Sequence, residues 1–206
     1  IAAAMGGTVP KPAPAAPAAT VTLTVSVLHA SLEHASYPLA IGHYDGDMIV
    51  GAEAVLDGKL DKRLSQRRLM NLYPGKAGTV EVILNPQGQT QGEAKGALVI
   101  GLGEMGQITP DIVIRGVTEA ALRLALAKRD ALETPPGSAA GGSESSSTTK
   151  PASAAFSALL IGTRSARALS IESAVSAIVT GALFANRALA DRELLDQVCI
   201  DKIEFV

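Results

Sequence analysis

ALVIGLGEMGQITPDIVIRGVTEAAL, residues 97–122, and ALLIGTRSARALSIESAVSAIVTGAL, residues 158–183, decide the fold of this chain. The two stretches align without a gap at a constant offset of 61 residues. Each contains an apolar run that ends in a glycine, Gly101 or Gly162, then a polar loop, a hydroxyl residue that can cap a helix, and apolar residues at helical spacing. Such strand-loop-helix units favour right-handed crossovers and a largely parallel or mixed sheet covered by helices. The sequence therefore predicts an α/β domain with an internal strand-loop-helix repeat.

Further elements are predicted on both sides of the repeat. Strands are expected where residues alternate or form short apolar runs, at residues 21–28, 38–41, 79–84 and 198–206. Residues 48–60 carry apolar side chains at helical spacing and predict a helix, with a polar helical turn to follow at 61–70. Ligands on such sheets usually bind at the carboxyl ends of the strands. Those ends are expected in the loops at residues 42–47, 101–107 and 162–168.

The length and composition indicate one globular domain. The chain has 206 residues, 47% of them hydrophobic and only 3% aromatic, so small aliphatic side chains must fill the core. Residues 1–20 are rich in Ala and Pro and are interpreted as a tether. Residues 134–154 are rich in Ser, Gly and Pro and are interpreted as a flexible insertion. The expected organisation is a tether followed by a single α/β domain over residues 21–206.

The charge pattern argues against several classes of partner. A net charge of −2 provides no general basic field, so nucleic acid is an unlikely partner. The basic run at Lys59, Lys62, Arg63, Arg67 and Arg68 is interspersed with acidic residues and is interpreted as a solvated helix face.

The chain is expected to act in the cytoplasm. Residues 173–186 form the longest charge-free stretch near the carboxyl end and are too few to cross a bilayer, so no membrane association is expected. The single cysteine, Cys199, excludes an internal disulfide and fits a reducing compartment.

The segment GLGEMG, residues 101–106, matches the dinucleotide-binding fingerprint and follows a predicted strand. Thr109 and Pro110 nevertheless place the start of the helix too late for it to meet a pyrophosphate, and no acidic strand end follows at the usual spacing. No nicotinamide or flavin cofactor is therefore expected. A glycine turn that shapes the strand-to-helix connection is the preferred interpretation.

A less specific anion site is a better hypothesis for these loops. The helix N-termini after the two glycine loops could present N–H groups to a phosphate, a diphosphate or a carboxylate. Arg164 and Arg167 could add positive charge to the second loop, although an exposed, solvated pair is the commoner role. The candidate ligand-binding residues are those of the three loops, namely Gly42, His43, Tyr44, Asp45, Gly101, Gly103, Gly106, Gly162, Thr163 and Arg164.

The polar cluster GHYDGD, residues 42–47, leaves its chemistry open. His43 with Asp45 or Asp47 could form a base with an orienting carboxylate, or part of a metal site. Capping of the following helix by Asp45 or Asp47 is the favoured alternative. No HExxH, GxSxG or Walker motif occurs in the chain, so no catalytic or metal-ligating residue is assigned.

Four segments also resemble a known kind of domain: GHYDGDMIVGAEAVLD (42–57), NLYPGKAGT (71–79), ALVIGLGEMGQIT (97–109) and ALLIGTRSARALSIESAVSAIVTGALFANRALA (158–190). They resemble a domain of large bacterial proteins that also carry a caspase-like CHAT peptidase region, and this domain is similar to the macro-like N-terminal domain of leucyl aminopeptidases. The resemblance covers most of residues 21–206 outside the linkers. It implies a macro-like, three-layer α/β/α sandwich with a mixed sheet.

The resemblance does not carry peptidase activity over to this chain. Neither the NTDAEGRL signature of the aminopeptidase catalytic domain nor a caspase His/Cys pair is present. The expected function is a non-catalytic ligand-binding or protein-interaction module of a larger bacterial protein, which regulates an attached effector or a partner protein. Its expected small-molecule partner is a nucleotide or another anion. The alternative is an enzyme that acts on a phosphorylated or nucleotide-like substrate through His43, Tyr44 and Asp45, and a structural assembly domain is a third possibility.

Overall fold

The computed structural model describes residues 21–86, 93–133, 151–164 and 168–206. It contains six strands, which are β1 (Thr24–Val27), β2 (Leu39–His43), β3 (Val80–Leu84), β4 (Gly96–Gly101), β5 (Ala152–Ala158) and β6 (Val198–Phe205). Its helices are the short 3-10 helix η1 (Leu32–His34) and the α-helices α1 (Ala52–Lys59), α2 (Arg63–Leu69), α3 (Pro110–Glu133) and α4 (Ile171–Ala190). All the strands predicted at residues 21–28, 38–41, 79–84 and 198–206 are present.

The strands form one mixed sheet in the order β1-β6-β5-β2-β4-β3. Within the described residues, only β3 is antiparallel to its neighbour, and the other four pairings are parallel. The parallel strands therefore end at the same edge of the sheet, and the loop that leads into β3 reaches this edge too. The predicted mixed sheet is confirmed.

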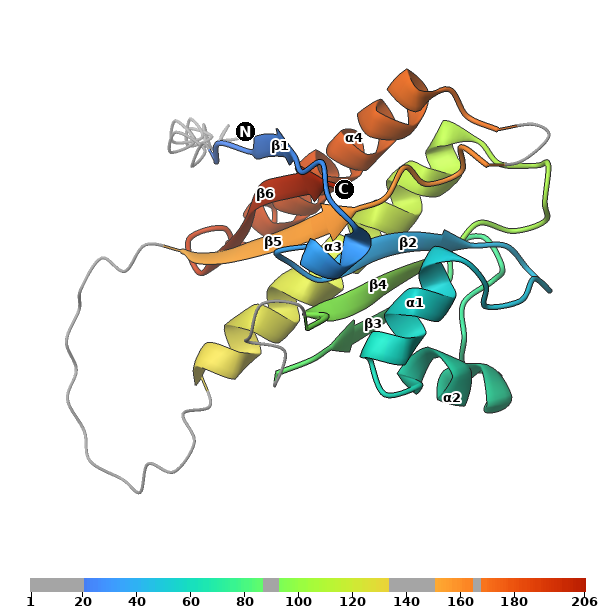
Figure 1. Cartoon of the computed structure of the whole chain (residues 1–206). Helices are drawn as coiled ribbons and strands as arrows, with labels where there is room; N and C mark the ends of the chain where they lie inside the picture. Colours follow the sequence, from blue (N-terminus) through green and yellow to red (C-terminus); the bar gives the residue numbers. More distant parts are fainter. Residues whose placement is uncertain (1–20, 87–92, 134–150, 165–167) are drawn as a thin grey trace, which may run out of the picture.

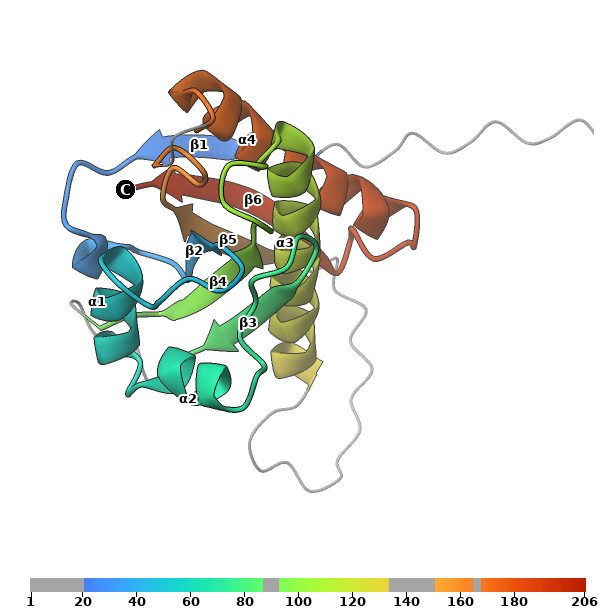
Figure 2. The same ribbon diagram turned by 90° about the vertical axis from the view of Figure 1, so that its right-hand side faces the viewer.

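Helices cover both faces of the sheet, as Figures 1 and 2 show. The helices α3 and α4 lie against one face, and α1 and α2 lie against the other. Side chains alternate along β2, so that Ala40 joins the core under α3 and α4, whereas Leu39 and Ile41 join the core under α1 and α2. The fold is a three-layer α/β/α sandwich, as predicted.

The apolar character of α4 is explained by its place in this sandwich. By length and composition alone α4 could cross a membrane, with a mean hydropathy of 1.3 over its most apolar window. Its residues Ala177, Ile178, Ala182 and Ala185 instead belong to the core shared with α3 and the sheet.

The internal repeat is real, but its strands are not aligned as the constant offset predicts. The helices do keep the offset of 61 residues, since α3 begins at Pro110 and α4 at Ile171. The strand β5 ends at Ala158, however, so its loop (residues 159–170) is four residues longer than the loop after β4 (residues 102–109). The run that contains Leu159 and Gly162 therefore follows the strand, and the sequence ASAAFSA, buried from Ala154 to Ala158, forms the strand.

This shift also corrects the predicted insertion at residues 134–154. Its last three residues, 152–154, belong to β5, where Ala154 is fully buried. Its remaining residues up to 150 lie outside the described part of the chain, as does the predicted tether at residues 1–20.

Candidate ligand-binding site

Two cavities open at the sheet edge where β2, β4 and β5 end, one on each side of the loop that joins β2 to α1. The cavity beside the start of α1, here named the α1 cavity, has a volume of about 420 Å³. The cavity beside the end of α2, here named the α2 cavity, has a volume of about 490 Å³. Asp47, in the loop between them, lines both.

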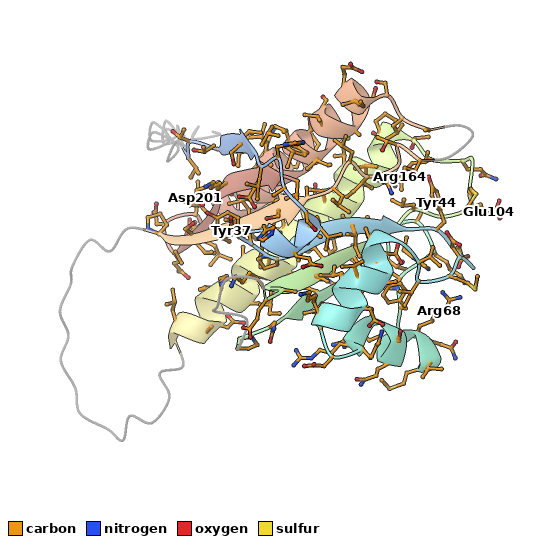
Figure 3. All side chains as sticks on the ribbon, viewed as in Figure 1. Tyr37, Tyr44, Arg68, Glu104, Arg164 and Asp201 are labelled. Carbon is orange, nitrogen blue, oxygen red and sulfur yellow. The ribbon has the colours of Figure 1, made fainter. Side chains whose placement is uncertain are left out.

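The α1 cavity is built from three strand-end loops and the start of one helix. The β2–α1 loop, the β4–α3 loop and the β5–α4 loop all contribute walls, and Val206 closes one side. Its lining residues include Gly42, Tyr44, Val50, Gly51, Ala52, Glu53, Leu102, Met105, Gly162, Thr163 and Arg164. Figure 3 shows Tyr44 and Arg164 at this end of the sheet. A site where several parallel strands end is the usual position for ligands in open α/β sheets.

The N-terminus of α1 opens into this cavity. Its N-cap residue Gly51 has φ 56°, a conformation that favours glycine, and provides no side-chain cap. The first N–H groups of a helix have no acceptor within the helix and carry a partial positive charge. Because Gly51, Ala52 and Glu53 line the cavity, an anionic group placed there can accept from these N–H groups.

The sequence predicted this role for α3 and α4, whose first residues lie away from both cavities. The helix α4 has its own cap, because the Ser170 hydroxyl oxygen accepts from the Ser173 N–H at 3.1 Å. Neither Pro110 nor Ile171, the first residues of α3 and α4, lines either cavity. The signal for α1 was a glycine, Gly51, in front of a helical pattern where a capping side chain would be expected.

The ten candidate ligand-binding residues fall into three groups. Gly42, Tyr44, Gly162, Thr163 and Arg164 line the α1 cavity. His43 and Asp45 line the α2 cavity. Gly101, Gly103 and Gly106 line neither cavity, so the structure does not bring the whole set together. Arg167, also considered, lies outside the described residues.

Packing explains why Gly101 is a glycine. A Cβ atom at this position would overlap the Lys76 carbonyl oxygen and the Thr79 hydroxyl, because the loop before β3 crosses the end of β4 here. Gly103 and Gly106 have φ of 77° and 85° and form the turn after β4. The GLGEMG segment is thus a packing and turn element, and only its Leu102 and Met105 face the α1 cavity.

His43 is held in a buried cluster with Glu53 and Tyr73. Its Nδ1 lies 2.9 Å from Glu53 Oε2, and its ring packs edge-on to Tyr73 at 4.8 Å between centroids. The Tyr73 hydroxyl donates to the same Glu53 oxygen at 3.4 Å. Burial and the Glu53 carboxylate raise the pKa of Tyr73, so its hydroxyl keeps its proton and remains a donor. The carboxylate partner of His43 is therefore Glu53, and neither Asp45 nor Asp47 takes that role.

The two aspartates do not cap α1 either. Asp47 Oδ1 accepts from the neighbouring Met48 N–H at 2.7 Å, and the helix begins only at Ala52. Among the residues that the structure describes, no three His, Cys, Asp or Glu side chains are grouped to hold a metal ion. The metal alternative for His43 therefore lacks a set of ligands.

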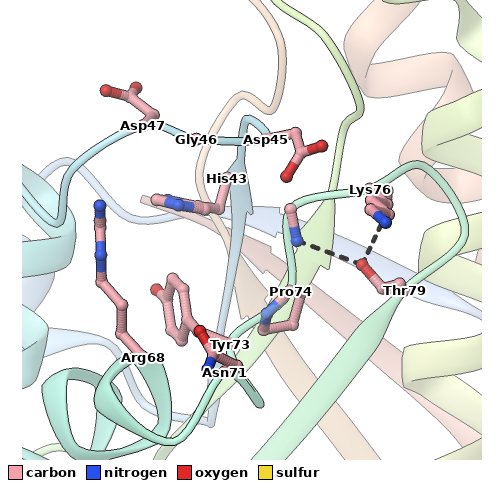
Figure 4. Close-up of a pocket in the computed structure, with 11 residues that line it drawn as sticks. His43, Asp45, Gly46, Asp47, Arg68, Asn71, Tyr73, Pro74, Lys76 and Thr79 are labelled. Carbon is pink, nitrogen blue, oxygen red and sulfur yellow. Dashed lines mark hydrogen bonds between the residues drawn. The ribbon is translucent and has the colours of Figure 1, made fainter.

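The basic run on α2 is not a uniformly solvated face. Arg67 Nε contacts Glu81 Oε1 at 2.5 Å, and Arg63 Nη1 donates to the Leu84 carbonyl at 3.2 Å. Arg68 turns toward the α2 cavity, where it stands along one wall beside His43 and Tyr73, while Lys76 and Thr79 form the opposite wall (Figure 4).

Comparison with known proteins adds a fold relationship. No family model matches the sequence, and a search of curated proteins gives no significant match. Among solved structures, the chain is similar to the macrodomain of Mycobacterium tuberculosis DarG, with a TM-score of 0.51 and 12% identity, over 89% of this chain and 97% of that one. At this identity the similarity concerns the fold, and it confirms the macro-like sandwich.

Proposed function

We propose that this chain is a non-catalytic module that binds a nucleotide-like or other anionic small molecule in the α1 cavity. The observation that carries the proposal is the convergence of the β2, β4 and β5 loops with the uncapped N-terminus of α1 around about 420 Å³. A volume of this size accommodates a ligand of the nucleotide class.

The walls of the α1 cavity suit the two parts of such a ligand. Val50, Leu102 and Met105 offer apolar surface, which fits a flat base or another ring. The first turn of α1 offers N–H groups, and the exposed Arg164 offers a guanidinium at the rim, which fits a phosphate or carboxylate group. Glu53, the acidic residue in that turn, is engaged by His43 and Tyr73.

The wider role of the module is the second part of the proposal. Ligand binding would regulate an attached effector or a partner protein, in a larger bacterial protein of the cytoplasm, with a CHAT-type peptidase region as the candidate effector. The sequence resemblance supports this part, and the α1 cavity supports only the binding step.

Thermal unfolding with a panel of ligands tests the binding step. AMP, ADP, ADP-ribose and inorganic phosphate at millimolar concentration should include at least one that raises Tm, since binding to the native state adds stability. Arg164→Met should weaken that effect, whereas Arg192→Met, which removes an exposed positive charge on the segment after α4, should leave it unchanged. No rise in Tm with any ligand would contradict the proposal.

The alternative, an enzyme that uses His43, Tyr44 and Asp45 together, has less support than the binding module. Side chains alternate at the end of β2, so His43 and Asp45 open into the α2 cavity and Tyr44 opens into the α1 cavity. A base and its partners must reach one substrate. These three residues therefore do not form a single catalytic arrangement.

A further inference from the structure

The two edges of the sheet differ in how they are covered. The strand β3 forms one edge and β1 forms the other. Residues of β3 alternate between bonds to β4 and the edge, and Val80 and Leu84 face the edge. The Val80 carbonyl accepts from Arg123 Nη1 at 3.1 Å. The Leu84 carbonyl accepts from Arg63 Nη1 at 3.2 Å. Side chains of α3 and α2 thus satisfy carbonyl groups that an added strand would need.

The edge at β1 has no such cover. The Leu28 N–H donates to the Phe205 carbonyl at 2.7 Å, so the even-numbered residues of β1 bond to β6. Val25 and Val27 therefore direct their N–H and C=O groups away from the sheet. No side chain of the described residues bonds to these four groups. The two valine side chains are also exposed, at 46% and 80%. An edge of this kind is a template for a further strand.

The sequence of β1 also lacks the residues that keep sheet edges apart. Residues 21–28, VTLTVSVL, contain no charged residue and no proline. The strand β3, by contrast, carries Glu81, which pairs with Arg67. Exposed valine and threonine side chains suit a strand that is paired on both sides. Because β1 has only four residues, a partner strand gains few hydrogen bonds from it, and the association that it supports is weak.

The helix α4 adds an apolar side chain next to this edge. It packs on β6, the neighbour of β1, and Figures 1 and 2 both show it beside β1. Leu183 follows Gly181, which abuts α3, by two residues and therefore points about 200° away from it around the helix. Asn186, whose side chain bonds to β6, lies only about 60° from Leu183. Leu183 is 47% exposed and thus lies on the side of α4 that is away from α3 and toward the β1 edge.

We propose that two copies of this chain associate through β1, which pairs antiparallel with β1 of a second copy across a two-fold axis. Val25 then lies opposite Val27 of the second copy, and all four outward N–H and C=O groups of each strand find partners. The valine side chains also meet across the two strands, on one face of the joined sheet.

A second copy suits this edge for two reasons. An isologous contact uses the same patch twice, and a patch without charge does not repel its own copy. A two-fold axis that relates antiparallel strands of one sheet is perpendicular to that sheet, so the α4 helices of both copies lie on the same face. Leu23 belongs to the core under α3 and α4, and Val25 and Val27 alternate to that face too. The inference does not depend on the proposed function.

Sedimentation equilibrium of the 206-residue chain tests the association. Between micromolar and millimolar concentration the average mass should rise from 21.0 kDa toward twice that value. Over the same range the amide protons of Val25 and Val27 should exchange more slowly with solvent, because they become hydrogen-bonded. A chain that stays monomeric at millimolar concentration would overturn the proposal. A dimer in which these two amide protons exchange as fast as in the monomer would overturn it as well.

Single variants assign the association to β1. Val27→Lys should weaken it about tenfold, because the two-fold axis loses two cross-strand valine pairs at once. Val55→Lys places the same charge at an exposed valine of α1, away from this edge, and should leave the association unchanged. Since Val27 is exposed in the single copy, Val27→Lys should keep the Tm of the wild type at micromolar concentration. Equal weakening by both substitutions would contradict the proposal.

A double variant tests the register of the two strands. Val25→Glu should weaken the association as Val27→Lys does. The combination of Val25→Glu with Val27→Lys should restore part of it, because the two opposite charges then face each other across the strands. A double variant that associates less than either single variant would show that Val25 does not lie opposite Val27 of the second copy, and the proposed pairing would be wrong.

Discussion

The imidazole Nδ1 of His43 lies 2.9 Å from Glu53 Oε2, and this pair connects the two cavities. His43 lines the α2 cavity and Glu53 lines the α1 cavity. Both side chains are largely buried, at 5% and 14% exposure. The pair fixes the end of β2 to the first turn of α1, so it sets the position of the helix N-terminus that the proposed ligand would meet.

Glu53→Ala should therefore destabilise the protein. The substitution leaves His43 Nδ1 and the Tyr73 hydroxyl without their acceptor in a buried place, which costs about 2 kcal/mol in the free energy of unfolding. Urea unfolding at neutral pH measures this change. Glu119→Ala removes an exposed carboxylate that pairs with Arg123 on α3 and should cost about 0.5 kcal/mol or less. Equal losses in the free energy of unfolding would show that the buried His43–Glu53 pair stabilises the protein no more than the exposed pair does.

The helix part of the fold was predictable because caps and turns are local. The Ser170 cap and the start of α3 at Pro110 follow from a few neighbouring residues, and both are confirmed. The strand β5 was misplaced because its sequence, ASAAFSA, has no β-branched residues, whereas the following loop contains Leu159, Leu160 and Ile161. Its position between β2 and β6, buried on both faces, makes it a strand in spite of that composition.

The site was predictable only where it depended on strand ends. The loops after β2 and β5 do line a cavity, and alternation along β2 could have separated His43 from Tyr44. The partners Glu53, Arg68 and Tyr73 were missed, because they come from α1, from α2 and from the loop before β3. No local pattern shows that these segments meet beside His43.

Asp57→Ala should unfold α2 or loosen it. Asp57 belongs to α1 and is 2% exposed, and its Oδ1 accepts from the N–H groups of Leu64 and Ser65 at 2.9 and 3.1 Å. The carboxylate thus caps the start of α2 from another helix, and the residue preceding that helix provides no side-chain cap. Its loss should cost about 2 kcal/mol in urea unfolding. The exposed Asp196 provides the control, since Asp196→Ala should have little effect.

Glu204 should make the protein sensitive to acid. Burial alone would raise the pKa of its carboxyl, but hydrogen bonds from the Ser36 N–H, the Ser157 hydroxyl and the Ser36 hydroxyl outweigh burial and lower it. A lowered pKa in the folded state means that the ionised carboxylate stabilises the fold at pH values above about 4.5, the pKa in the unfolded chain. This contribution disappears as the pH falls through the lower pKa of the folded state.

Unfolding free energies measured between pH 7 and pH 2 check this prediction for Glu204. Glu204→Gln should be less stable than the wild type at pH 7, and the difference should shrink toward zero at the acid end. The exposed Glu119→Gln should show no comparable trend. A difference between Glu204→Gln and wild type that stays constant with pH would rule out the role of ionisation.

Two helical glycines should respond to alanine in opposite directions. At Gly181 a Cβ atom would lie 2.7 Å from Val117 Cβ and 2.9 Å from the Ile114 carbonyl oxygen, because α4 crosses α3 closely at this point. The Thr118 hydroxyl lies 3.1 Å from the Gly181 carbonyl oxygen, which helps to keep the two helices at this distance. Gly181→Ala should therefore force α3 and α4 apart and cost roughly 1–3 kcal/mol.

Gly58 is the matched control for Gly181. It lies inside α1, and a Cβ atom there would meet nothing within 4 Å. Gly58→Ala should stabilise the protein by roughly 0.5–1 kcal/mol, because alanine loses less backbone freedom than glycine when a helix forms. Urea unfolding of both variants gives the comparison. If Gly181→Ala were also stabilising, the close approach of α3 and α4 would not limit packing, and the glycine at this crossing would need another explanation.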